Sequence, residues 1–167
     1  MLEEINHIAL IGGLMQQMCI YLVIAYLLSK TPLFSPLIQL TVRLPGKLVC
    51  YTVFSAFCIM GTYLGYQIEG AIANTRAIGA VLGGILGGPA VGMAVGLTGG
   101  LHRYSLGGFT ASACAVSTTV EGLIGGCLHL YLLRRHRADR LLHPMNVLIT
   151  TLIAETAQMI IILLMAR

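Results

Sequence analysis

Three charged side chains stand inside or beside apolar runs of this sequence, where each needs a chemical reason. Arg76 and Arg103 flank the glycine-rich run 77–100, and Glu121 lies within the apolar run 109–133. A charge removed from water is costly unless it is paired, so such groups usually face a cavity or a partner. Because a guanidinium can hold a carboxylate through two parallel hydrogen bonds, the two arginines predict a site for a small carboxylate.

One face of a predicted helix can complete this site. Cys114, Ser117, Glu121 and Gly125 recur at spacings of three and four residues, which puts them on one side of a helix. Gly107 and Gly108, followed by Thr110, predict that this helix begins near Thr110, before Cys114. The free N–H groups at a helix start favour anions. Cys114 and Ser117 therefore join the two arginines as candidate ligand-binding residues.

Each candidate also has a simpler interpretation. Arg76 could extend its charge to the lipid headgroups, and Arg103 could pair with a lipid phosphate from a loop. Small residues such as Cys114 and Ser117 also let membrane helices pack closely. Glu121 could be the structural partner of an arginine rather than a ligand group. Three polar residues are predicted to support the site: Asn74, Thr110 and Glu121.

The composition assigns these residues to a membrane protein. Of 167 residues, 57% are apolar, 10% are charged and 20 are glycine, with a mean hydropathy of +0.87. An ordinary soluble domain carries about 25% charged residues. The net charge of +4 comes mostly from two short basic stretches, which is typical of loop bias and excludes a nucleic-acid partner. No catalytic constellation or metal-ligand spacing occurs, so we expect no catalytic residues, no metal and no cofactor.

The chain offers five apolar stretches of about the length that a membrane span needs. The third differs from the others, because nine of its 24 residues are glycine and Gly87-Gly88-Pro89 interrupts its centre. Glycine and proline disfavour a helix interior, so this stretch predicts two half-helices around a break. We expect an all-α polytopic membrane protein with about four full transmembrane helices and a re-entrant helix pair. The stretches are 6–29, 48–66, 77–100, 109–133 and 145–166.

Charge placement supports the re-entrant pair. If residues 77–100 dip into the membrane and return, the basic stretches Lys30–Lys47 and Arg134–Arg140 share one face, which the positive-inside rule makes cytoplasmic. Arg76 and Arg103 then lie together on the outer face. This topology places the N-terminus outside.

The motifs of the third and fourth stretches resemble the LytS-type transmembrane receptor domain of bacterial sensor histidine kinases. The resemblance covers nearly the whole chain, and the segments Leu28–Phe34 and Thr41–Pro45 look most like its pyruvate-sensing members. Arg76, Arg103, Cys114 and Ser117 match the family motif. The matching segments are Asn74–Gly79, Gly83–Pro89, Gly99–Gly108, and Cys114 and Ser117 up to Glu121-Gly122.

This resemblance implies a function for residues 1–167 as a transmembrane sensory domain. It implies a receptor in the bacterial inner membrane that binds external pyruvate and signals through a kinase to a LytTR-type response regulator, with a homodimer as the full-length form. The family's last span, GAF-like segment and kinase would follow Arg167, so this chain itself is expected to lack enzymatic activity.

Two other functions fit the same residues. A broken helix around a mid-membrane site is also how transporters are built, so a small organic-acid transport component is the main alternative. A scaffold or holin-like membrane protein that binds no ligand is the second of these other functions.

Overall fold

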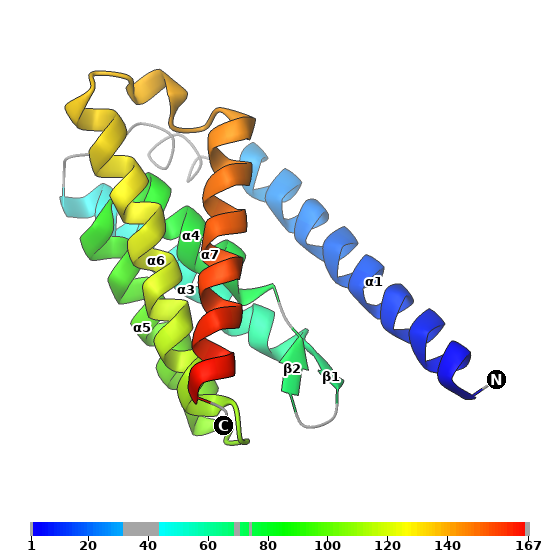
Figure 1. Cartoon of the computed structure of the whole chain (residues 1–167). Coiled ribbons are helices and arrows are strands. Elements are labelled where there is room, and N and C mark those ends of the chain that lie inside the picture. The colour runs from blue at the N-terminus through cyan, green and yellow to red at the C-terminus, as the bar shows by residue number, and fades with distance from the viewer. Residues whose placement is uncertain (1, 32–43, 69–70, 74, 166–167) are drawn as a thin grey trace.

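The computed structural model describes residues 2–31, 44–68, 71–73 and 75–165, and these form a helical bundle (Figure 1). Three of the helices, α3, α6 and α7, are long and apolar enough to cross a membrane. The elements in chain order are α1 (Leu2–Lys30), α3 (Leu44–Tyr63), β1 (Tyr66–Ile68), β2 (Ala71–Ala73), α4 (Arg76–Gly87), α5 (Pro89–Ser105), α6 (Ala111–Arg134), the 3-10 turn η1 (Ala138–Arg140) and α7 (Pro144–Met165).

A short β-hairpin departs from the all-α prediction. β1 and β2 pair antiparallel between α3 and α4, with Tyr66 opposite Ala73 and Ile68 opposite Ala71. Each strand has three residues, too few to show the alternation of apolar and polar side chains by which a strand is recognised in a sequence.

The predicted break in the third apolar stretch is confirmed. α4 ends at Gly87, Gly88 has a φ of +86°, and Pro89 begins α5. Glycine adopts this left-handed backbone without strain, and proline suits the first helical position because it has no N–H to leave unbonded. The chain reverses here, so that Gly79 in α4 and Gly99 in α5 both approach Cys58 of α3. α4 and α5 therefore form a helical hairpin.

Glycines let this hairpin pack against the backbone of α6. A Cβ atom added at Gly96 would lie 2.5 Å from the carbonyl oxygen of Thr118, and one at Gly100 would lie 2.6 Å from that of Ala115. Such spacing excludes any side chain at these positions. The close packing that small residues permit in membrane helices thus brings α5 and α6 together along most of α5.

The tip of the hairpin stops short of the end of α6. A Cβ atom at Gly88 would lie 3.4 Å from the ring of His129, and Pro89 packs on Gly126. Because α6 continues to Arg134 and rises about 1.5 Å per residue, the tip lies about 8–12 Å before that end. This geometry agrees with a hairpin that enters the bundle from one end and returns.

The two ends of the bundle differ in charge. Lys30 at the end of α1 and the arginine-rich connection between α6 and α7 lie at one end, and the β-hairpin, the α5–α6 turn and the start of α1 lie at the other (Figure 1). The described parts of the two basic stretches therefore share a side, as predicted. Arg43 falls outside the described residues, and the external N-terminus stays a prediction.

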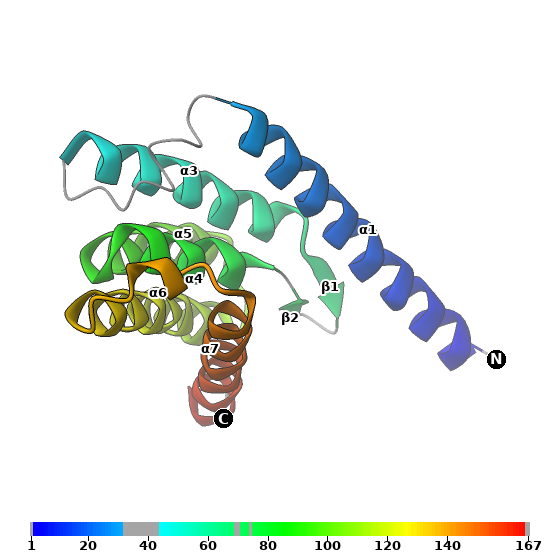
Figure 2. The same cartoon turned by 90° about the horizontal axis from the view of Figure 1, so that it is seen from above.

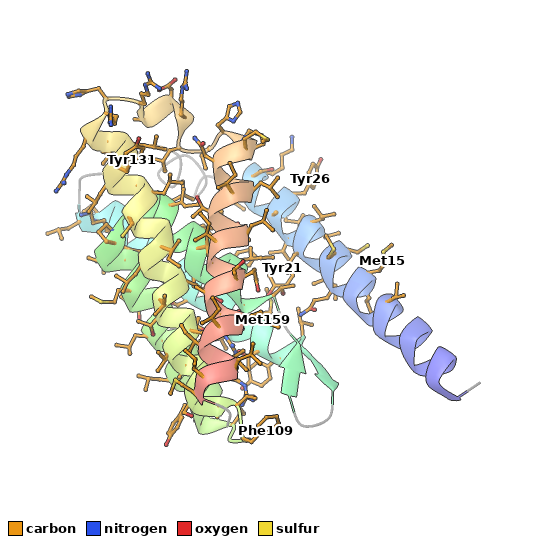
Figure 3. All side chains as sticks on the ribbon, viewed as in Figure 1. Met15, Tyr21, Tyr26, Phe109, Tyr131 and Met159 are labelled. Atoms are coloured by element: carbon orange, nitrogen blue, oxygen red, sulfur yellow. The ribbon has the colours of Figure 1, made fainter. Side chains whose placement is uncertain are left out.

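The outer helices α1 and α7 expose long apolar side chains. Figure 2 shows α1 lying along the outside of the bundle, and Figure 3 shows Met15 of α1 and Met159 of α7 pointing away from it. Both methionines are about three-fifths exposed, at 61% and 60%. Lipid tails or other helices are the natural surroundings for such faces.

Candidate functional site

Arg76 is held where the hairpin begins. It is the first residue of α4 and 1% exposed, and its Nε donates a hydrogen bond of 2.9 Å to Oγ1 of Thr118 on α6. The Thr118 hydroxyl in turn donates to the carbonyl oxygen of Cys114 at 2.7 Å, and the Cys58 thiol donates to the carbonyl oxygen of Arg76 at 3.3 Å. These bonds fix the guanidinium against α6 and the backbone of Arg76 against α3.

Arg103 is held where the hairpin ends. It lies in the last turn of α5 and is 1% exposed. Its Nη1 donates to the carbonyl oxygen of Gly107, and its Nη2 lies 3.5 Å from Oγ1 of Thr110, the residue before α6. Gly107 has a φ of +73°, a backbone conformation that glycine adopts readily, and this lets the chain reverse direction between α5 and α6. The predicted helix start at Thr110 is confirmed within one residue.

The two arginines bracket Cys114 along α6. Thr110, Cys114 and Thr118 are spaced four residues apart and are all buried, so they share one face of α6. Arg103 is held at Thr110, the N-terminal end of this face. Arg76 is held at Thr118, one turn from Cys114 toward the C-terminal end of α6. At 1.5 Å per residue, the two anchoring hydroxyls lie about 12 Å apart along the helix.

Ser117 completes the cluster from the same helix. Its side chain is fully buried, and its hydroxyl donates a 3.1 Å hydrogen bond to the carbonyl oxygen of Cys114. All four candidate residues, Arg76, Arg103, Cys114 and Ser117, are therefore buried, and the last two lie on α6 between the residues that bond the two arginines. The supporting candidate Thr110 joins them, whereas Asn74 lies outside the described residues.

Glu121 lies one turn above Ser117 and is 1% exposed. Neither of its carboxylate oxygens has a hydrogen-bond partner among the described residues. Its electrostatic neighbours are Arg76 of α4, Glu155 of α7 and Cys58 of α3. The cluster therefore contains a carboxylate of its own beside a candidate carboxylate-binding arginine.

Thr118 is a site residue that the sequence did not predict individually. Its spacing of four residues from Cys114 and eight from Thr110 was a usable signal, because such spacing continues one helical face. A threonine in a membrane helix usually bonds its own backbone, as Thr118 does with Cys114. Its second bond, to Arg76, depends on the packing of α4 and could not be read from the sequence.

A large cavity lies elsewhere, between α1, α3 and α4. It has a volume of about 410 Å³, and its walls are almost entirely apolar, with Met18, Leu22, Phe54, Phe57 and Leu82 among them. A carboxylate there would lose its hydration without gaining hydrogen bonds. The chemistry of a carboxylate site therefore belongs to the arginine cluster and not to this cavity.

Comparison with known proteins assigns the family. Residues 31–167 match the family model described as "5TMR of 5TMR-LYT". The chain belongs to the 5TMR-LYT receptor family. The family resemblance found in the sequence is thereby confirmed.

Relatives of this 5TMR-LYT domain are sensor proteins. The chain is 63% identical over 154 residues to sensor histidine kinase BtsS of Escherichia coli strain K12, an alignment covering 92% of this chain and 28% of BtsS. It is 36% identical over 170 residues to sensor protein LytS of Bacillus subtilis strain 168, an alignment covering 92% of this chain and 28% of LytS. Sensor histidine kinase YpdA of E. coli K12 is 30% identical over 119 residues, covering 70% of this chain and 21% of YpdA. No solved structure matches the chain significantly.

The 5TMR-LYT domain accounts for only part of these relatives. The chain spans 28% of the length of BtsS and of LytS. It corresponds to a membrane sensor region of histidine kinases, and its apolar helices make it part of a multi-pass protein of the inner membrane.

Proposed function

We propose that this chain is the input domain through which a sensor histidine kinase detects external pyruvate. The observation that carries the proposal is the pair of buried arginines, one on each arm of the hairpin, that bracket Cys114 and Ser117 on α6. Two cationic forks on a glycine-packed hairpin suit a small anion with a planar carboxylate. The choice of pyruvate among small carboxylates draws on the likeness to the pyruvate-sensing members of the family.

Each residue has a distinct role in this proposal. The Arg76 and Arg103 guanidiniums, whose anchoring hydroxyls lie about 12 Å apart along α6, turn toward Cys114 to hold the ligand's carboxylate between them. The Ser117 hydroxyl, which can turn from the Cys114 carbonyl, donates to the ligand's oxo group. Cys114 forms the wall between the arginines without bonding covalently.

The size of the ligand limits its affinity. A six-heavy-atom acid gains at most about 1.5 kcal/mol per atom, or about 9 kcal/mol in total, which corresponds to a sub-micromolar Kd at best. We expect a Kd in the micromolar range, because part of this energy is used to replace the ligand's hydration.

Signalling would follow from a shift between two packings of the hairpin. The ligand favours the state in which both arms close on α6, and the movement passes to the helices that lead toward the kinase. The full-length protein would work as a homodimer and pass the signal to a LytTR-type response regulator.

Titration calorimetry on the purified chain tests the binding site. Loss of one charged hydrogen-bonding group costs about 1.5–3 kcal/mol, so Arg76→Ala and Arg103→Ala should each weaken pyruvate binding by about tenfold to a hundredfold. Arg137→Ala is the matched control, because Arg137 is exposed in the α6–α7 connection at the opposite end of the bundle. Wild-type affinity in both cluster variants would refute the site, and no pyruvate binding by the wild-type chain would refute the function.

The α4–α5 hairpin also favours one other function. Broken helices that meet near the membrane midplane carry the substrate sites of many transporters. Liposomes containing the chain should bind labelled pyruvate without accumulating it if the chain is a receptor. Accumulation above the bound amount would favour an organic-acid transport component.

A further inference from the structure

Glu121 has an unusual position for an acidic side chain. It is almost completely buried, and neither carboxylate oxygen accepts a hydrogen bond from the described residues. Buried polar groups are nearly always hydrogen-bonded, and an exception calls for an explanation. The carboxylate oxygens of Glu121 are therefore ready either to bind a partner or to bind a proton.

The ionisable groups near Glu121 come from three other helices. α4 contributes the Arg76 guanidinium, α7 contributes the Glu155 carboxylate, and α3 contributes the Cys58 thiol. α5 faces this part of α6 with the glycines Gly92 and Gly96, which carry no side chain. Arg76 is thus the one cation beside Glu121 among the described residues, and Glu155 is a second anion.

A ligand carboxylate at Arg76 changes this balance of charge. With Glu121 ionised, Arg76 already faces one buried negative charge, and the ligand would add another beside the same guanidinium. Like charges interact strongly where water is excluded, and a carboxyl group that shares a site with another carboxylate is readily held in its protonated form. A neutral Glu121 would remove the repulsion between the two carboxylates.

We propose that Glu121 takes up one proton when the ligand carboxylate binds at Arg76, so that the receptor binds its anionic ligand together with a proton. The proton comes from the solvent, bonds to a carboxylate oxygen of Glu121 and leaves again when the ligand dissociates. This inference rests on the proposed carboxylate site and adds a dependence of that site on pH. The receptor would then respond to the acid form of its signal, which is more abundant where the medium is acidic.

Calorimetry with pyruvate, in buffers that differ in ionisation enthalpy, measures the proton directly. In the part of the range from about pH 6 to pH 9 in which Glu121 is ionised before pyruvate binds, the wild-type chain should take up as much as about one proton per pyruvate bound, and its Kd should rise by as much as about tenfold per pH unit. Pyruvate itself remains ionised throughout this range. Proton uptake must therefore belong to the protein.

Two amide variants locate the proton. Glu121→Gln keeps the shape of the side chain without its charge, so it should bind pyruvate with no proton uptake and with an affinity that does not change with pH. Glu155→Gln should retain the uptake, because Glu155 lies on the exposed surface of α7. Thermal unfolding of each variant confirms that it folds.

The outcomes separate this inference from the function on which it rests. Pyruvate binding without proton uptake at any pH in the range, or with full uptake in Glu121→Gln, overturns the role of Glu121 and leaves the carboxylate site intact. Absence of pyruvate binding by the folded wild-type chain overturns the proposed function itself.

Discussion

The helices α4, α5 and α6 pack backbone against backbone, whereas α1 and α7 turn long apolar side chains outward. In the inner region, Gly92, Gly96 and Gly100 of α5 lie against α6 with no room for a Cβ atom. In the outer region, α7 buries only Thr150 and Ala154. The buried charged groups of the described chain, Arg76, Arg103 and Glu121, all lie in the inner region.

This difference shows what glycine contributes to the receptor. Close backbone contact surrounds the charges with protein, where partners and hydrogen bonds can compensate the loss of water. Long apolar side chains cover the surface that faces lipid or other helices. Each region should respond to mutation in its own way.

The largest effect is expected from a methyl group in the inner region. Gly92→Ala puts a Cβ atom 2.6 Å from the Cα of Gly84 and even nearer to the carbonyl oxygen of Gly122. Because backbone cannot move aside as a flexible side chain does, we expect a loss of at least about 3 kcal/mol in stability or failure to fold. Thermal unfolding measures the loss of stability, and the yield of monodisperse protein in detergent shows whether the variant folds.

Gly12→Ala is the matched control in the outer region. A Cβ atom at Gly12 meets nothing within 4 Å, and alanine favours a helix by about 1 kcal/mol over glycine. The variant should be as stable as wild type or slightly more so. Equal destabilisation by the two alanines would show that the comparison between regions is wrong.

A second pair of variants compares one side chain in both regions. Ile85 is fully buried between α4 and its neighbours, whereas Ile160 is exposed on α7. Ile85→Ala should cost about 2–4 kcal/mol through the cavity it leaves, and Ile160→Ala should cost much less because lipid or detergent fills the space. Comparable losses of thermal stability would mean that α7 is covered in the folded protein.

A third pair tests how the inner region positions Arg76. Thr118→Val removes the acceptor of the Arg76 Nε while keeping the shape of the side chain. Loss of a hydrogen bond to a charged group costs about 1.5–3 kcal/mol, so pyruvate affinity should fall by about tenfold or more. Thr119→Val is the control, because the described contact of the Thr119 hydroxyl is with the carbonyl oxygen of Ala115 in its own helix. An equal effect of both valines on affinity would exclude a positioning role for Thr118.

The local features of the inner region could be predicted from the sequence. The break at Gly88-Pro89 follows from backbone preferences alone, and the shared face of Cys114, Ser117 and Glu121 follows from helical spacing. Both depend on residues close together in the chain.

The contacts between helices could not be predicted in the same way. Thr118 reaches Arg76 only because Gly96 sets the register of α5 against α6 and the hairpin then brings α4 alongside. The β-hairpin is too short for a periodic signal. The burial of Glu121 without a hydrogen-bond partner depends on the packing of four helices at once.

The smallest effect is expected where the outer helix α1 meets the bundle. Tyr21 is one of two buried residues on the described part of α1, and its hydroxyl donates a 3.3 Å hydrogen bond to the carbonyl oxygen of Phe57 while its ring stacks on the Phe57 ring. Tyr21→Phe keeps the stacking and loses the hydrogen bond, so stability should fall by about 0.5–1.5 kcal/mol in thermal unfolding.

The same variant tests whether α1 contributes to the carboxylate site. Neither the bond that Arg76 donates to Thr118 nor the bond that its carbonyl oxygen accepts from Cys58 involves α1. Pyruvate affinity in Tyr21→Phe should therefore change by less than about threefold, because the Tyr21 hydroxyl bonds the Phe57 carbonyl oxygen and not the Arg76 guanidinium. A tenfold loss, equal to that of Thr118→Val, would extend the inner region to α1, because the helix that packs loosely would then take part in holding the ligand.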